Sequence, residues 1–202
     1  MARVHHVKHA RKDNPVCKKG EDYYHWTPFR SAKRYSKTYP RGSQLCSGRK
    51  SEVMAHQEAL ADDLSAATDY EEIKAACEAC AEGLRQCGEE YKESAENMRE
   101  YFPDSEQADN MEEMAQSLET QADELEGLDF DGPEDFDDPE PEEPQAGEFG
   151  TNDEYEDAVV EYDGLKDEWD SAKEDREEEI ENFCFLLKEE AQSASDDVEF
   201  LF

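Results

Sequence analysis

Three cysteines in the middle of the chain are the residues whose spacing first suggests chemistry. Cys77 and Cys80 form a Cys-x-x-Cys pair, and Cys87 follows on the same stretch. Such a pair can ligate zinc or carry redox chemistry. In a helix, however, Cys77 and Cys87 would lie roughly 15 Å apart along the axis, whereas zinc holds each sulfur at about 2.3 Å. We therefore interpret the three thiols as small apolar residues of a packed helix face.

The other residues that could ligate a metal ion are also too few or too far apart in the sequence to indicate a site. His5 and His9 would share a metal ion only if residues 1–20 were helical, and we expect that basic segment to be a solvated tail. Cys17 and Cys46 bracket the aromatic segment and could pair or share a metal with His25, but the paired cysteines of a ribbon-type zinc site are missing. The sequence has no Gly-rich phosphate loop and no HExxH motif. We predict a non-enzymatic protein with no metal and no cofactor.

The spacing around the three cysteines predicts a long helix from Asp69 to Phe102. Apolar or small residues recur there in alternating steps of four and three, which is typical of a helix packed lengthwise on other helices. These seam positions are Ile73, Cys77, Cys80, Leu84, Cys87, Tyr91, Ser94, Met98 and Tyr101. Asp69 and Glu72 form an expected capping box at the start, and Pro103 ends the helix.

Two neighbouring segments continue this pattern. Residues 51–67, with Ser51 as the expected cap, present Val53, Gln57, Leu60, Leu64 and Ala67. Residues 104–127, with Asp104 as the expected cap, present Met111, Met114, Leu118, Gln121 and Leu125. Because short connections make consecutive helices antiparallel neighbours, residues 51–127 are expected to form a three-helix bundle or hairpin array. Gln121 either sets the register or lies near the open end.

The last third of the chain is strongly acidic. Residues 128–150 contain 10 Asp or Glu and four Pro, which predicts an extended linker or a binding peptide for a basic partner. Thr151 and Glu154 form a capping box, and a helix is expected to follow to about residue 194. Its apolar positions are Tyr155, Val159, Tyr162, Leu165, Trp169, Ile180, Phe183 and Leu187. The charged residues 173–179 predict a solvent-bridging segment or a break.

The charge changes sign along the chain. Residues 1–50 contain 13 Lys or Arg and 3 Asp or Glu, a sum of +10. The remaining residues contain 8 basic and 53 acidic residues, a sum of -45, and the whole chain therefore carries -35. The basic part suits a polyanion or an acidic protein surface, whereas the acidic part would repel nucleic acid and membranes.

Aromatic and basic residues alternate within the basic part. A two-stranded ribbon is expected near residues 22–29 and 33–38, with a turn between them and a flexible joint at 41–50. Lys and Arg would contact phosphates while exposed rings stack on bases, unless those rings form a small core beneath the ribbon. The candidate nucleic-acid contacts are Arg11, Lys12, Lys18, Lys19, Tyr23, Tyr24, Trp26, Arg30, Lys33, Arg34, Tyr35, Lys37 and Arg41.

Three resemblances bear on function. Residues 21–40 resemble the small β-ribbon DNA-binding domains of phage integrases. The first 45 residues resemble a group of uncharacterised bacteriophage proteins, which implies a phage origin but no known activity. Residues 198–202 resemble a degenerate sliding-clamp-binding peptide, which would make Phe200, Leu201 and Phe202 partner-binding residues unless the tail folds back on the bundle.

Together these patterns predict a mainly α protein: an elongated antiparallel helical bundle or coiled coil with a small basic N-terminal β-ribbon. The expected parts are a basic head (1–50), a three-helix bundle (51–127), an acidic linker (128–150) and a long acidic helix with its tail (151–202). The favoured function is a phage-type accessory protein whose head binds nucleic acid and whose acidic helices bind a protein. The alternative is a helical scaffold or DNA mimic whose head contacts an acidic protein surface.

The expected setting is the cytoplasm. No run of 18 apolar residues and no secretory signal pattern occurs in the sequence. The apolar seam of the helices also leaves room for homo-oligomers.

Overall fold

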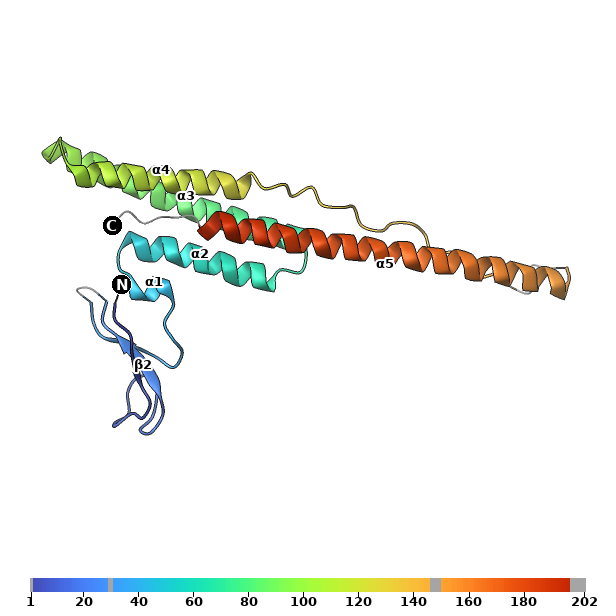
Figure 1. The fold of residues 1–202 in the computed structure, drawn as a ribbon, viewed down its shortest axis with the longest axis horizontal. Helices are drawn as coiled ribbons and strands as arrows, with labels where there is room; N and C mark the ends of the chain where they lie inside the picture. The colour runs from blue at the N-terminus through green and yellow to red at the C-terminus, as the bar shows by residue number, and fades with distance from the viewer. Residues whose placement is uncertain (1, 29–30, 146–149, 197–202) are drawn as a thin grey trace. The chain divides into compact units, whose positions relative to one another are not determined.

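The computed structural model describes residues 2–28, 31–145 and 150–196, and it confirms a mainly helical protein with a small antiparallel sheet near the N-terminus (Figure 1). The chain divides into two compact units, Met1–Leu128 with Glu190–Phe202, and Asp129–Glu189. The predicted contact Arg30 and the predicted partner-binding residues Phe200, Leu201 and Phe202 lie outside the described residues.

Helix α3, Tyr70–Tyr101, is the central element of the first unit. Asp69 caps it as predicted, since its Oδ1 accepts the Glu72 N–H at 2.8 Å. The Glu72 carboxylate reaches back to the N–H of Thr68 at 2.7 Å, one residue earlier than expected. The predicted seam is buried from Ile73 to Tyr91.

The seam prediction is wrong at its C-terminal end. Ser94 and Met98 are half-buried, and Tyr101 is 74% exposed. The reason is the length of the neighbouring helix α2, Arg49–Ala66. Its first residue, Arg49, already pairs with Glu90 of α3 at 3.1 Å. The last turns of α3 therefore extend past the start of α2.

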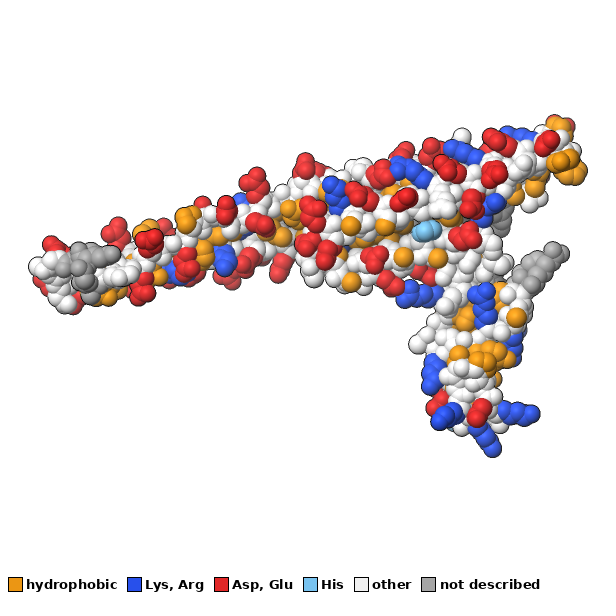
Figure 2. Space-filling view, turned by 180° about the vertical axis from the view of Figure 1, so that it is seen from behind, with side chains coloured by type: hydrophobic (Ala, Val, Ile, Leu, Met, Phe, Trp, Pro, Cys, Tyr) orange, Lys and Arg blue, Asp and Glu red, His pale blue; other side chains and the backbone are white. Residues whose placement is uncertain are grey.

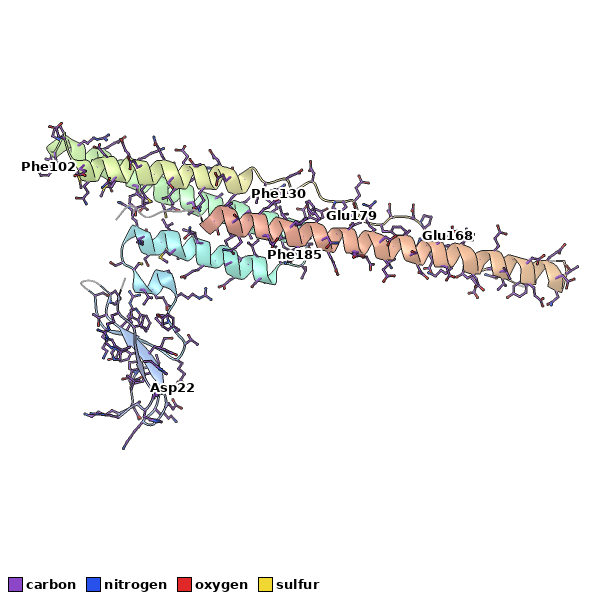
Figure 3. All side chains as sticks on the ribbon, in the orientation of Figure 1. Asp22, Phe102, Phe130, Glu168, Glu179 and Phe185 are labelled. Atoms are coloured by element: carbon purple, nitrogen blue, oxygen red, sulfur yellow. The ribbon has the colours of Figure 1, made fainter. Side chains whose placement is uncertain are left out.

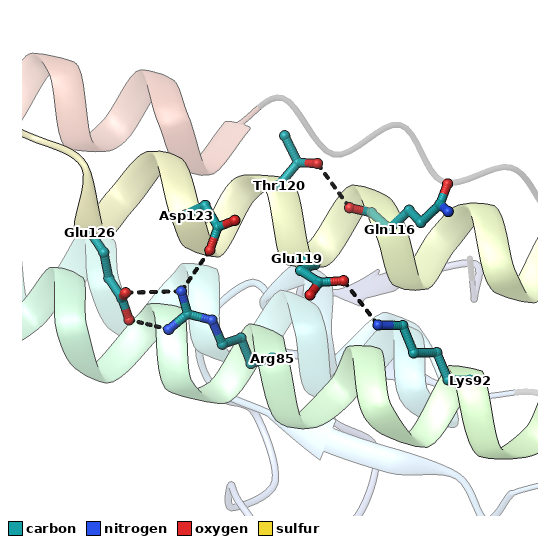
Figure 4. A network of polar contacts seen from close by, with 7 residues as sticks. All are labelled: Arg85, Lys92, Gln116, Glu119, Thr120, Asp123 and Glu126. Atoms are coloured by element: carbon teal, nitrogen blue, oxygen red, sulfur yellow. Dashed lines mark hydrogen bonds and ion pairs between the residues drawn. The ribbon is translucent and has the colours of Figure 1, made fainter.

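Helix α4, Glu106–Glu126, packs antiparallel to α3. Three cations of α3 pair with carboxylates of α4, and the residue numbers of the partners fall as those of the cations rise, as expected for antiparallel helices. Figure 4 shows the pairs made by Arg85 and Lys92. The pairs are Arg85 with Asp123 and Glu126, Lys92 with Glu119, and Arg99 with Asp109 and Glu112. Between these pairs and α2 lies a core that includes Leu84, Met114 and Leu118.

Two predicted helix caps are wrong. Ser105 rather than Asp104 caps α4, because the preceding turn closes with the Ser105 N–H on the Phe102 carbonyl at 3.2 Å. Helix α2 begins after Gly48, whose φ of 70° lies in the left-handed region that glycine adopts without strain. Ser51 lies inside that helix, and its hydroxyl donates to the Ser43 carbonyl at 2.5 Å.

Two glutamines hold the end of the last helix, α5, Asn152–Asp196. Gln121 is 3% exposed and donates to the carbonyls of Ala194 and Ser195, each at 2.8 Å. Gln57 donates to the Ser195 carbonyl at 2.6 Å. These carbonyls belong to the last turn, where intrahelical donors run out. Gln57 of α2 and Gln121 of α4, the polar residues of the two predicted seams, therefore cap the C-terminal end of α5.

The second unit contains most of α5 and the acidic segment before it. Residues 129–145 form no helix or strand. The predicted capping box is confirmed, since the Thr151 N–H donates to Glu154 Oε2 at 3.1 Å and the Glu154 N–H to Thr151 Oγ1 at 3.4 Å. The helix continues through residues 173–179 without a break, and Arg176 pairs there with Glu179 at 2.9 Å.

One position of the predicted apolar stripe on α5 is wrong. Leu165 is 50% exposed. Lys166 takes its place, four residues after Tyr162 and three before Trp169, and its ammonium lies 4.2 Å from the Trp169 ring centroid. A long lysine side chain can cover apolar surface in this way while its charge stays solvated.

Within the described residues the N-terminal sheet has three short antiparallel strands, in the order β1, His5–Val7; β2, Tyr23–Trp26; and β3, Arg34–Ser36. The predicted ribbon corresponds to β2 and β3. The expectation of a solvated tail is wrong for β1, which pairs with β2 in the register His5 with His25. The expected joint at 41–50 contains the short helix α1, Gly42–Leu45, whose Ser43 N–H donates to Glu58 of α2 at 2.9 Å.

No helix among the described residues has both the length and the apolar character needed to cross a bilayer.

Replacing a seam leucine should destabilise the bundle strongly. Leu84 is fully buried, so Leu84→Ala should lower the free energy of unfolding by about 2–5 kcal/mol. Leu165→Ala is the matched control, because this leucine is half exposed and its replacement should change the value by less than about 0.5 kcal/mol. Urea unfolding followed by circular dichroism measures both, and equal effects would contradict the assigned core.

Candidate nucleic-acid interface

One face of the N-terminal sheet carries four rings from three strands. Side chains alternate between the two faces along each strand. The register places His5 beside His25, and His25 beside Tyr35, while Tyr23 lies two residues before His25 on the same side. We call His5, Tyr23, His25 and Tyr35 the aromatic face. Its histidine from β1 is exposed and the other three side chains are half-buried, so ring surface remains available to a ligand.

The rings of the aromatic face form one connected cluster. His5 and His25 stack with centroids 5.0 Å apart and planes at 26°. Tyr23 lies 5.9 Å from His25 and 6.0 Å from Tyr35, in tilted arrangements. Neighbouring rings at these distances attract one another and fix each other's orientation. The face is therefore a preformed platform of π surfaces.

A cation lies beside this platform. The Lys33 ammonium is 5.5 Å from the Tyr35 ring centroid. Burial, followed by the charges of Lys33 and His5, lowers the pKa of His25 below its ordinary value. At neutral pH the His25 ring is therefore neutral and suited to stacking, while Lys33 supplies the positive charge.

The opposite face of the sheet is covered at Trp26, whereas Tyr24 on that face is half-buried and His6 is exposed. Trp26 is 3% exposed, and its indole N–H donates to the Gln44 carbonyl of α1 at 2.8 Å. Tyr24 stacks on His6 at 4.5 Å and meets the edge of Tyr39 at 5.6 Å. Of the predicted aromatic contacts, Tyr23 and Tyr35 thus share the aromatic face, Tyr24 lies on the other side, and Trp26 belongs to a small core.

Hydrogen bonds from side chains and from the backbone itself order the connection between β1 and β2. Asn14 Oδ1 accepts the N–H groups of Val16 and Cys17 at 3.0 and 2.9 Å. Asp13 accepts the Lys19 N–H at 2.7 Å, and the Ala10 N–H donates to the Glu21 carbonyl at 2.8 Å. We call residues 11–19 the basic loop. It holds four exposed predicted contacts: Arg11, Lys12, Lys18 and Lys19.

The remaining predicted cations differ in their surroundings. Lys37 pairs with Glu21 at 3.5 Å and Arg41 with Asp62 at 2.6 Å, so a carboxylate already compensates each charge. Lys33 and Arg34 are exposed at the start of β3. In Figure 2 the basic side chains gather over the sheet and its loops, and acidic side chains cover the helices.

Sequence reasoning missed the two histidines of β1 and β2. The signal that could have placed His5 on a strand is the segment Val4–Val7, in which apolar residues flank His5 and His6 in a short run compatible with a strand, whereas His25 already lies within the predicted ribbon. The strand itself depends on pairing with residues 16 or more positions away. A local pattern of four residues does not specify such a partner.

The cysteines do not form a metal site or a disulfide. None of the six cysteines, each within the described ranges, forms a disulfide, and the described residues contain no cluster of three or more potential ligands arranged to hold a metal ion. Cys17 accepts a hydrogen bond from Asn14 at 3.1 Å, and Cys46 lies 3.5 Å from the Met54 sulfur. Cys77, Cys80 and Cys87 are buried in the α3 seam, as expected.

No protein-family model matches this chain, and no curated protein or solved structure matches it. Function therefore has to be argued from the geometry of the sheet and helices.

The buried thiols predict an alkaline loss of stability. Burial raises the pKa of Cys77 to about 11 and that of Cys80 to about 12, from an ordinary value of 9.0. The folded state therefore retains protons that the unfolded chain releases, and the corresponding stability is lost as the pH rises from about 9 through those values. Urea midpoints measured across this range should fall more steeply for the native sequence than for the Cys77→Ala/Cys80→Ala variant. If the urea midpoints of the two proteins fell equally with pH, the raised pKa values of Cys77 and Cys80 would be contradicted.

Proposed function

We propose that the head, residues 1–50, binds single-stranded nucleic acid, and that the acidic helices engage a protein partner. Bases stack on the aromatic face, and the basic loop contacts phosphates. The setting that we propose is the cytoplasm of a phage-infected host, as the resemblance of the first 45 residues to bacteriophage proteins implies. The protein acts by binding, without a cofactor.

The observation that carries this proposal is the pairing of a half-exposed ring cluster with nearby cations. Tyr23 and Tyr35 lie 6.0 Å apart on one face, with Lys33 beside Tyr35. Proteins that bind single strands combine such stacking surfaces with a positively charged track for the backbone, because every base has a π face and every nucleotide a phosphate. Paired bases in a duplex would not offer their faces to this sheet, which favours a single strand.

The charge distribution supports different binding partners for the head and for the helices. The head sums to +10, and the remainder of the chain sums to -45. Like charges repel, so nucleic acid would be confined to the head and kept off the helices. The helices would then be free to contact a protein.

Removing the two tyrosines should weaken binding. Each base stacked on an aromatic ring contributes about 1–3 kcal/mol, so the loss of two rings in Tyr23→Ala/Tyr35→Ala should cost about 2 kcal/mol or more and raise the Kd for a labelled single strand by about 30-fold or more. Fluorescence anisotropy measures this. Tyr101→Ala is the matched control, because that tyrosine is 74% exposed at the end of α3. Equal Kd values for all three proteins would exclude the aromatic face.

The basic loop should govern the salt dependence. Each Lys or Arg that neutralises a phosphate releases counterions, so affinity should fall steeply between about 50 and about 300 mM salt. Lys12→Gln/Lys18→Gln should make the slope shallower by about one unit for each phosphate that the variant no longer neutralises. Lys37→Gln should change it less, since Glu21 already compensates that ammonium.

A salt response that is flat over this range would remove the nucleic-acid proposal. Binding of an acidic protein by the head, or of a DNA-binding protein by the helices, would then take its place. Deletion of residues 1–50 separates these two, because it abolishes partner capture in the first case and leaves it intact in the second.

A further inference from the structure

Helix α5, in which acidic residues predominate, carries a basic and aromatic site. Lys166 and Lys173 lie three residues before and four residues after Trp169, so the three side chains share one side of the helix. Their ammonium groups are 4.2 and 5.3 Å from the Trp169 ring centroid. Lys166 also pairs with Asp170 of the same helix at 3.0 Å. We call Lys166, Trp169 and Lys173 the α5 site.

A stretch of the acidic segment occupies the α5 site in the same unit. Phe136 meets the Trp169 ring with centroids 5.4 Å apart and planes at 70°, an edge contact. The Trp169 indole N–H donates to the Asp138 carbonyl at 2.9 Å. The Lys166 ammonium pairs with Glu140 at 2.7 Å. Figure 3 shows this segment running beside α5 in the region of Glu168 and Glu179.

These contacts come from alternate residues of an extended chain. The side chains of Phe136 and Glu140 are separated by an even number of residues, which places both on one side of an extended segment, and the backbone carbonyl of Asp138 contributes the contact between them. Hydrogen bonds to Glu140 and Asp170 raise the pKa of Lys166, so its ammonium stays charged. The site therefore matches its occupant in shape, hydrogen bonding and charge.

We propose that the α5 site is a receptor for extended acidic peptides that carry a phenylalanine, and that residues 136–140 are its built-in occupant. The recognised pattern is Phe followed four residues later by an acidic residue. A protein partner with an exposed segment of this chemistry binds by displacing the chain's own. This inference does not depend on the proposed nucleic-acid function of the head.

Because residues 136–140 are part of the same chain, a partner has to compete with an intramolecular segment for the α5 site. A short linker gives an intramolecular segment an effective concentration in the millimolar range. A free peptide with the same few contacts therefore binds the native chain poorly, and a partner succeeds by being multivalent or by making additional contacts. Weakening the internal segment should open the site to the free peptide.

The test uses the full chain and the indole N–H signals of its two tryptophans in ¹⁵N-correlated NMR spectra. Phe136→Ala/Glu140→Gln should shift the Trp169 signal, because the variant has neither the phenylalanine ring against the indole nor the ion pair with Lys166. A peptide of residues 133–143 should return that signal toward its native position. The buried Trp26 signal is the internal reference and should stay constant.

Two controls define specificity. The same peptide should leave the native protein nearly unchanged at concentrations that saturate the double variant, by a margin of at least about tenfold. A peptide with alanine in place of its phenylalanine should not return the signal. Leu165→Ala added to the double variant should bind the peptide normally, since this half-exposed leucine lies outside the α5 site.

Three results would overturn the proposal. They are a Trp169 signal that the double substitution does not move, a double variant whose signal the peptide does not restore, and equal peptide responses of the native and double-variant proteins. Circular dichroism of each variant serves as the control, because loss of the helical signal would distinguish unfolding from a change at the α5 site.

Discussion

The structure depends on the burial of one narrow apolar stripe on α3. Ile73, Cys77, Leu84 and the small residues between them are enclosed by α2 and α4. Burial of this stripe has to outweigh the mutual repulsion of a chain that carries a net charge of -35. Cations of α3 such as Arg85 reduce that repulsion where it would be most costly, because they lie against the carboxylates of α4. Apolar packing and charge pairing thus act on the same two helices.

The sequence predicts those parts of the fold that local signals determine. The start of α3 follows from Asp69, and that of α5 from Thr151 and Glu154, because caps act within a few residues. Strand β1 and the role of Gln121 were not predictable in this way. Each depends on a partner far along the chain, 73 residues away for the bond from Gln121 to Ala194.

The candidate site shows the same limit. Alternation along a strand predicts that Tyr23 and Trp26 lie on opposite faces, but it does not say which face is covered. The covering element is α1, four residues long, in a segment whose composition indicates a joint. Its Gln44 carbonyl accepts the Trp26 indole N–H and leaves the face of Tyr23 available. Alternation along the strand thus divides the aromatic residues between the two faces, and the packing of α1 against Trp26 determines which of them is covered.

The free thiols of α3 determine the conditions under which the purified protein should be refolded. Cys77 and Cys80 are shielded while α3 is packed, but both become accessible together once the helix opens. An oxidant would then join two sulfurs that the native helix needs apart, and the crosslinked loop would be a kinetic trap on the way back. Refolding therefore requires a reducing buffer. A lower refolding yield in air would reflect chains trapped by a disulfide rather than low stability of the native state.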